Sequence, residues 1–230
     1  MIQQYDNLKM FDRRTDVKVL PIKQFFAEMG MEDVDYDSRV ALATKLSTDY
    51  DTILKMMILS LVLGEEVVAV QMASSLAQRI TDTLRNHFKE NPRYALEGRQ
   101  IDVLMDYSDF YLLRQIQEES EYFVDVTLRH LNDEYYFSTD RATLAAENEV
   151  NSVANYSEYA LALLSGKTKK TWRTMGDNRV RESHRMLNLT TLPIAEPFSI
   201  MGSAMKFPKD ESLGADREEL VGCRCWATYS

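Results

Sequence analysis

Apolar side chains recur at steps of three and four positions along most of residues 38–164, the spacing that places them on one face of an α-helix. The first such stretch covers about residues 38–64 and ends at a glycine. Its expected inward stripe is Ala43, Leu46, Tyr50, Ile53, Met57 and Leu61. The second covers about residues 65–89 and stops before an Asn-Pro pair, because proline cannot continue the helical backbone. Its expected stripe is Ala69, Met72, Leu76, Ile80, Leu84 and Phe88.

Two further helices are expected in the first three quarters of the chain. One covers about residues 101–132, and we expect it to bend or break near "QEESEY". The other follows "FSTD", in which Ser138 or Thr139 can serve as the N-cap. Asp140 then lies in the first turn, where the helix dipole favours a negative charge. This helix should end at about Leu164, because a glycine and basic residues follow.

After this helix the pattern changes to short apolar runs separated by prolines and glycines. Short strands are expected in "KTWRT", "EPFSIM", "AMKF" and "CRCWATYS", and a helical turn in "GADREEL". A helix over "NRVRESHRML" could be capped by Asp177. The predicted class is α+β, a mainly helical N-terminal region followed by a small C-terminal α+β domain. We expect an N-terminal arm at 1–37, a helical region at 38–165 and the α+β domain at 166–230.

The charge, the apolar runs and the cysteine content of the chain disfavour several classes of function. The 230 residues carry 36 acidic and 27 basic side chains, a net charge of −9, which disfavours binding of nucleic acid by the chain as a whole. No run reaches the roughly 18–20 apolar residues that span a bilayer, so no membrane span is expected. No secretory signal pattern is evident either. We therefore expect Cys223 and Cys225 to be thiols or ligands rather than a disulfide, which would be strained across one residue.

A candidate metal site comprises His184, Cys223 and Cys225, with Asp177 as a candidate fourth ligand. Alternate residues of a strand share a face, so both thiols of Cys-Arg-Cys would point the same way. One imidazole and two thiolates suit zinc. The alternative is two small buried side chains and a histidine in a structural hydrogen bond. Structural zinc sites usually separate paired cysteines by two to four residues, and here there is one.

A nucleophilic site is a weaker hypothesis. It would pair Cys223 or Cys225 with His184 in a small hydrolase or transferase, or Ser183 with His184 and an acid. No glycine elbow surrounds the serine, and neither cysteine follows an obvious helix start. We therefore expect the protein not to be an enzyme.

A basic cluster surrounds the same segment. Its members are Lys167, Lys169, Lys170, Arg173, Arg179, Arg181 and Arg185. They could contact DNA phosphates or an acidic protein surface. The favoured alternative is a solvated face, with Arg–Asp pairs that orient the strand and the helix. Trp172 is most simply a core anchor.

Several segments occur together in a familiar order. They are "ATLAAENEVNSVANYSEYA", "KKTWRTMGDNRVRESHRML", "EPF", "FPKD" and "GCRCW". Over about residues 141–225 this order and spacing resembles the phage Mu F-like minor head (head-morphogenesis) protein family. Two features depart from the pattern: Gly222 stands where the family has Asn, and "LNLTTLP" replaces an Asp-Gly turn.

The resemblance implies a virion component of a tailed bacteriophage rather than a reaction. It implies a minor capsid protein at the portal vertex that acts in head assembly or DNA packaging and delivery. Its partners would be the portal protein and the major capsid or scaffolding protein, with genomic DNA as a further candidate. The protein would be in the phage head, and in the host cytoplasm during assembly. No cofactor is expected from the resemblance, and zinc remains the candidate from the residues.

Overall fold

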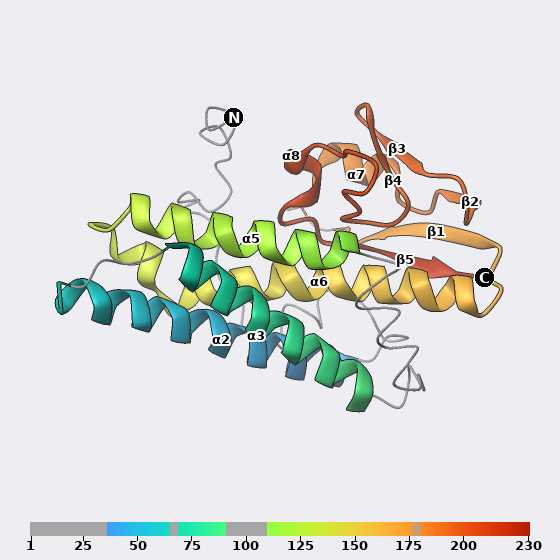
Figure 1. Ribbon diagram of the computed structural model, residues 1–230. Coiled ribbons are helices and arrows are strands. Elements are labelled where there is room, and N and C mark those ends of the chain that lie inside the picture. Colours follow the sequence, from blue (N-terminus) through green and yellow to red (C-terminus); the bar gives the residue numbers. More distant parts are fainter. Residues whose placement is uncertain (1–35, 65–68, 91–109, 177, 179) are drawn as a thin grey trace. The chain divides into compact units, whose positions relative to one another are not determined.

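The computed structural model describes residues 36–64, 69–90, 110–176, 178 and 180–230 (Figure 1). They form two compact units, and the boundary between the units falls within helix α6 (Thr139–Leu164), between Glu147 and Asn148. The earlier unit is helical and the later one carries all the described strands, which confirms the α+β class. Among the described residues, no helix is both long enough and apolar enough to cross a membrane.

The helical unit contains α2, α3, α5, a short 3-10 helix η2 and the start of α6 (Figure 1). Their bounds are Tyr36–Val62, Ala69–Glu90, Phe110–Arg129 and Glu134–Phe137 for the first four. Helix α3 packs against both α2 and α5. The predicted stripes supply most of this core, which includes Ala43, Leu46, Tyr50, Ile53, Met57, Leu76, Ile80, Leu84, Ile116, Phe123 and Val126.

Two expectations for this unit are wrong. Leu61 was placed on the inward stripe but is 38% exposed, because it lies in the last turn of α2 beyond the packed part of the helix. The expected bend near "QEESEY" does not occur, and α5 runs through it without a break. The polar residues there form i,i+4 contacts that support a helix, such as Arg114 Nε to Glu118 at 2.6 Å and Gln117 to Glu121 at 2.8 Å.

Both ends of α6 follow the sequence signals. Ser138 is the N-cap, and its hydroxyl accepts a hydrogen bond from the Arg141 backbone N–H at 3.2 Å. At the other end Gly166 has a φ of +68°, and the amides of Gly166 and Lys167 donate to the carbonyls of Leu163 and Ala162. This is the Schellman arrangement, in which glycine accepts the left-handed conformation at little cost.

A buried arginine ties the start of α6 to the rest of the helical unit. The guanidinium of Arg141 donates to the Thr127 hydroxyl at 2.5 Å and to the carbonyls of Tyr136 at 2.8 Å and Phe123 at 3.0 Å. It also lies 4.0 Å from the centroid of the Phe123 ring. Burial lowers the pKa of Arg141 from 12.5 to about 10, so the side chain stays charged at neutral pH.

The C-terminal unit combines the rest of α6 with short strands and helical turns (Figure 1). Strands β1, β2 and β5 form an antiparallel sheet in the order β2-β1-β5, while β3 and β4 form a separate hairpin. The strand bounds are Lys169–Thr174, Thr191–Pro193, Phe198–Ile200, Ser203–Met205 and Cys225–Tyr229. The two short helices are α7 (Glu182–Met186) and α8 (Arg217–Leu220). Strands β1, β3, β4 and β5 and helix α8 fall in the segments where short strands and the "GADREEL" turn were expected, whereas β2 was not expected from sequence.

The helix expected over "NRVRESHRML" is shorter than predicted. It begins at Glu182, and its N-cap is Arg181, whose side chain makes no capping bond. Arg181 instead has an extended backbone and donates from its guanidinium to the carbonyl of Val221. Val180 is buried just before it, so this segment packs against the unit instead of starting a helix. The predicted N-cap, Asp177, lies outside the described residues, as does Arg179.

Replacing Arg141 with alanine should lower the free energy of unfolding by about 2–4 kcal/mol, because buried acceptors lose their charged donor. Urea denaturation measures this change. Arg129→Ala is the matched control, since Arg129 makes an exposed pair with Asp125 on α5 and its loss should be close to neutral. A near-neutral Arg141→Ala would contradict the structural role assigned to this side chain.

Candidate functional site

Three asparagines of α6 hold the Cys-Arg-Cys segment in place. Asn148, Asn151 and Asn155 are spaced three and four residues apart, so they share one face of the helix. The Asn151 amide donates to the carbonyls of Cys223 at 2.7 Å and Cys225 at 3.4 Å, and the Asn155 amide donates to Cys225 at 3.0 Å. Both asparagines are buried, so each amide replaces water as the partner of a buried carbonyl.

Asn148 fixes the start of the same segment. Its side-chain oxygen accepts from the Gly222 amide at 2.9 Å and from Lys209 Nζ at 2.5 Å. Lys209 is itself buried and belongs to the "FPKD" segment. Gly222 has a φ of +63°, a left-handed conformation that glycine and asparagine both adopt readily. Glycine at position 222, where the pattern described above has asparagine, is therefore compatible with this backbone conformation.

The two thiols converge although only one is on a strand. Strand β5 begins at Cys225, and Cys223 lies in the turn before it, so the prediction that one strand carries both is wrong in that detail. The turn after α8 and the asparagine contacts orient Cys223 instead. The sulfurs of Cys223 and Cys225 and a ring nitrogen of His184 all lie within 4.8 Å of one another. Both cysteines are free thiols.

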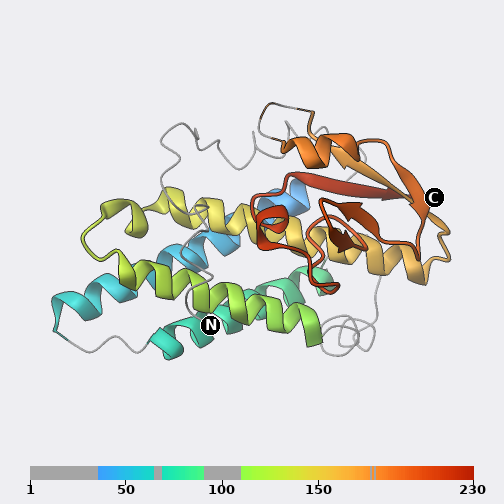
Figure 2. The same cartoon turned by 90° about the horizontal axis from the view of Figure 1, so that it is seen from above.

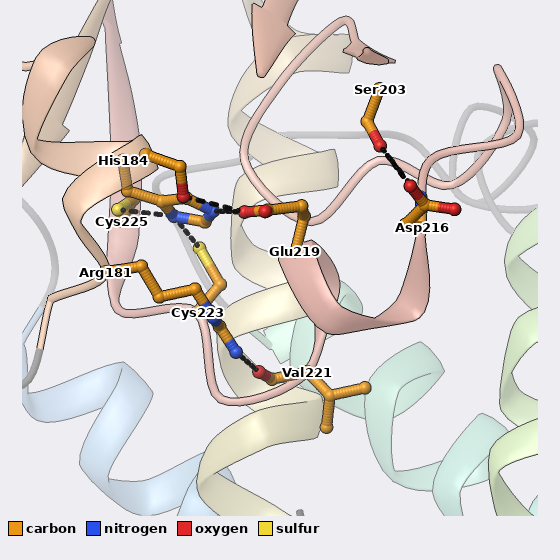
Figure 3. Close-up of polar contacts among 9 residues, drawn as sticks. Arg181, His184, Ser203, Asp216, Glu219, Val221, Cys223 and Cys225 are labelled. Carbon is orange, nitrogen blue, oxygen red and sulfur yellow. Dashed lines mark hydrogen bonds and ion pairs between the residues drawn. The ribbon is translucent and has the colours of Figure 1, made fainter. Parts of the chain in front are cut away.

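His184 lies between the thiols and a carboxylate (Figure 3). Helix α7 carries this side chain inward, where it is 1% exposed. Its Nδ1 is 3.4 Å from the sulfur of each cysteine, and its Nε2 is 2.7 Å from Oε2 of Glu219. Because a carboxylate only accepts hydrogen bonds, Nε2 carries a proton. Nδ1 is the nitrogen that faces the sulfurs, and it offers them a lone pair when the ring is neutral.

Trp172 and Glu219 complete the surroundings of His184. Trp172 on β1 is fully buried, and its ring meets the imidazole edge to face at 5.6 Å, which confirms it as a core anchor. Glu219 on α8 also accepts a hydrogen bond from the Ser183 hydroxyl at 3.0 Å. Sequence reasoning missed Glu219, since nothing in "GADREEL" distinguishes it from Glu218, which is exposed.

The charges of these groups depend on one another. Burial raises the pKa of Cys225 well above its usual 9.0, and its neighbour Cys223 raises it further. Burial acts the same way on Cys223, but hydrogen bonds from Cys225 and His184 and the positive His184 outweigh it and bring the pKa of Cys223 well below 9.0. For His184, burial lowers the pKa, yet the hydrogen bond and charge of Cys223 raise it above 6.5 overall. Cys223 and His184 therefore stabilise each other's charged forms, whereas Cys225 favours its neutral thiol.

The geometry is compatible with both the metal-site and the nucleophilic-site hypotheses. His184 Nδ1 and the two sulfurs offer a nitrogen and two soft donors facing one point, as a metal site requires. The order Cys223, His184, Glu219 also matches a nucleophile, a base and an orienting acid. Ser183 is not a comparable nucleophile, because its hydroxyl donates to Glu219. The fourth ligand suggested by sequence, Asp177, lies outside the described residues.

The basic cluster is not one solvated face. Lys170 is fully buried, and its Nζ donates to the carbonyl of Lys206 at 2.6 Å and lies 4.9 Å from the Phe198 ring centroid. Arg181 donates to the carbonyl of Val221. Arg185 pairs with Glu182 at 3.1 Å on its own helix, so the partner is a glutamate instead of the expected aspartate. Lys167 and Lys169 are exposed, and Arg173 on β1 is half-buried.

Comparison with known proteins adds one partial similarity. The chain is 35% identical over 102 residues to a protein of Bacillus subtilis (strain 168) named "Uncharacterized protein YqbB". The match covers 41% of this chain and 32% of the relative, so the chain spans about a third of that protein's length. No family model matches the chain, and no solved structure matches it.

Asn151→Ala should lower the free energy of unfolding by about 1–3 kcal/mol, because it leaves the carbonyl of Cys223 buried without this donor. Urea denaturation followed by Trp fluorescence measures it, since Trp172 lies in the same unit. The matched control is Asn188→Ala, which removes an exposed hydrogen bond to the Thr174 amide and should cost less. Equal effects of the two variants would contradict the role given to Asn151.

Lys170 should make stability depend on alkaline pH. Burial lowers its pKa from 10.5 to about 8, so between these values the unfolded chain binds more protons than the folded one. The contribution of Lys170 to stability therefore rises as the pH increases from 8 to 10.5. The difference in free energy of unfolding between the wild type and Lys170→Met should grow across this range. Lys169→Met, at the exposed neighbour, is the control, and a flat difference for Lys170→Met would be the contrary result.

Proposed function

We propose that the protein is a minor capsid or head-morphogenesis protein of a tailed bacteriophage, related to the Mu F-like minor head proteins. It would associate with the portal vertex and act in head assembly or in DNA packaging and delivery. The observation that carries the proposal is that the segments behind the resemblance, from Asn148 onward, lie together in one unit. The asparagine-rich helix, the histidine block and "CRC" contact one another through Asn151, His184 and Cys225. Figure 3 shows His184 beside both cysteines.

Burial at the centre of this unit favours a structural role over a catalytic one. His184, Cys223 and Cys225 are 1%, 4% and 0% exposed. A catalytic thiol must reach its substrate, and reactive cysteines are usually partly exposed. The Cys223–His184–Glu219 order supports a thiol hydrolase or transferase as the second candidate, and the burial of Cys223 ranks it below the assembly function.

A DNA-contacting module is supported less than a protein-contacting one. Phosphate binding needs exposed cations, and Lys170 and Arg181 are directed to backbone carbonyls within the unit. Arg185 is paired with Glu182. The exposed Lys167 and Lys169 and the half-buried Arg173 are the described members left for a phosphate contact.

The helical unit offers an apolar surface suited to a protein partner. The last turns of α2 and the residue after it expose several large apolar side chains, which we call the α2 tip: Met56, Ile58, Leu59, Leu61, Val62 and Leu63. Val62 is 77% exposed and Leu63 is 62% exposed. Contiguous apolar surface of this kind is characteristic of protein interaction sites. We assign the α2 tip to contact with the portal or capsid proteins.

Co-expression with the portal protein of the same phage should yield a complex that co-purifies. The double variant Leu59→Glu/Val62→Glu should reduce the bound fraction at least about tenfold, since two charges would be buried at the contact. Size-exclusion chromatography with light scattering measures the complex. The matched control is Leu163→Glu/Leu164→Glu, which places the same two charges at exposed leucines at the end of α6.

Three outcomes decide the assignment. A complex lost in the double variant and kept in the control supports the α2 tip as the contact. A complex kept in both would move the contact elsewhere and refute the α2 tip. A wild-type chain that binds neither the portal nor the major capsid or scaffolding protein would contradict the proposed function itself.

A further inference from the structure

His184, Cys223 and Cys225 present three donor atoms with the spacing of a metal site. Zinc binds thiolate sulfur at about 2.3 Å and imidazole nitrogen at about 2.0–2.1 Å, in a tetrahedral arrangement. These lengths place each nitrogen–sulfur pair around one zinc ion about 3.6 Å apart. The structure places His184 Nδ1 at 3.4 Å from both sulfurs. We propose that His184, Cys223 and Cys225 bind a zinc ion that stabilises the C-terminal unit.

The equal distances distinguish this reading from a catalytic pair. A nucleophile and its base need one sulfur near one ring nitrogen, and the second cysteine would then have no assigned task. Here Nδ1 is the same distance from Cys223 as from Cys225. Three donors directed at one point are explained by a single ion between them.

Glu219 supplies the outer interaction that histidine ligands usually have. A metal-bound imidazole almost always donates its other N–H to a carboxylate, a carbonyl or water, which fixes the tautomer and the ring orientation. Glu219 Oε2 accepts from His184 Nε2 at 2.7 Å (Figure 3). The Ser183 hydroxyl donates to the same oxygen at 3.0 Å. The lone pair on Nδ1 is thereby directed to the sulfurs. Glu219 is a positioning residue in this site and does not touch the ion.

The backbone around the thiols is fixed before any ion arrives. Asn151 and Asn155 bind the carbonyls of Cys223 and Cys225 from α6, and Asn148 binds the amide of Gly222. Trp172 closes one side of the imidazole. A site held in this way loses little conformational freedom on binding, which raises affinity.

The donor set selects zinc among the common metals. Two thiolates exclude the hard cations calcium and magnesium, which take oxygen ligands. Iron–sulfur clusters generally require four cysteines, and this chain has two. A tetrahedral zinc ion takes one donor more than these three, which a bound water molecule can supply.

The direct test is elemental analysis of the full-length protein, expressed with zinc and purified without chelators. We expect zinc in an amount equimolar with the chain, and loss of most of it in His184→Ala and in Cys223→Ser. His130→Ala is the control, because this histidine lies in the helical unit and bonds to the Val126 carbonyl. Cobalt substitution should give the absorption bands of a tetrahedral, thiolate-bound ion. X-ray absorption should count two sulfur donors and two nitrogen or oxygen donors.

A graded test uses Glu219, where folding is less at risk than at the buried ligands. Glu219→Ala should weaken zinc binding about 10–100-fold in a chelator competition. Glu219→Gln should lose less, since its amide oxygen still accepts from Nε2–H. Glu218→Ala, at the exposed neighbour on α8, should bind as the wild type does.

Chelator treatment separates binding from folding. Removing zinc from the wild type should lower its Tm, and adding zinc back should restore it. A folded wild type that contains almost no zinc and takes up none on addition would overturn the proposal. So would zinc that remains equimolar in folded Cys223→Ser and His184→Ala. Both outcomes are independent of whether the protein binds a portal.

Discussion

The C-terminal unit depends on the hydrogen bonds that the asparagines of α6 make with residues 222–225. The carbonyls of Cys223 and Cys225 lie in a buried segment, and a purely apolar helix face would leave them without donors. An unsatisfied buried carbonyl costs about 1–3 kcal/mol, which is a large fraction of the roughly 5–15 kcal/mol by which a folded domain is stable. Asn151 and Asn155 donate to these carbonyls and so remove that cost. The same hydrogen bonds fix the position of the start of β5 along α6. Figure 2 shows α6 and β5 extending side by side over this part of the unit.

Once this segment is fixed, the positions of the remaining groups follow. Strand β5 pairs with β1 and sets Ala227 opposite Trp172. Trp172 then forms the wall against which His184 packs. The turn between α8 and β5 connects Glu219 to Cys223 over four residues, so the carboxylate and the thiol reach His184 from opposite sides. One local constraint therefore determines a polar cluster assembled from α7, α8 and β5.

The periodic pattern of apolar residues predicted the long helices well, because burial of one apolar face is enough to determine them. The helices α2, α3 and α6 and the cap at Ser138 appear as expected, because a repeated apolar face and a capping hydroxyl act locally. The start of α7 was not predictable in this way. Arg181 is taken up by the carbonyl of Val221, forty residues later in the chain, and such a contact has no local sequence signal. The unbroken α5 shows the reverse case, where local i,i+4 pairs outweighed an apparent breaker.

The sequence predicted the three candidate metal ligands but not the residues that position them. His184, Cys223 and Cys225 stand out by residue type, whereas Asn151, Asn155 and Glu219 look like ordinary helix-surface residues until the fold buries or pairs them. The contacts of these three residues nevertheless explain why the sequence contains the asparagine-rich helix α6, the segment around His184 and the Cys-Arg-Cys segment together. Each segment satisfies polar groups of another, so none of the three folds into this arrangement alone. Gly222 fits the same logic, because the left-handed conformation there brings its amide to Asn148. The pattern is thus the description of one polar core, distributed over three stretches of sequence.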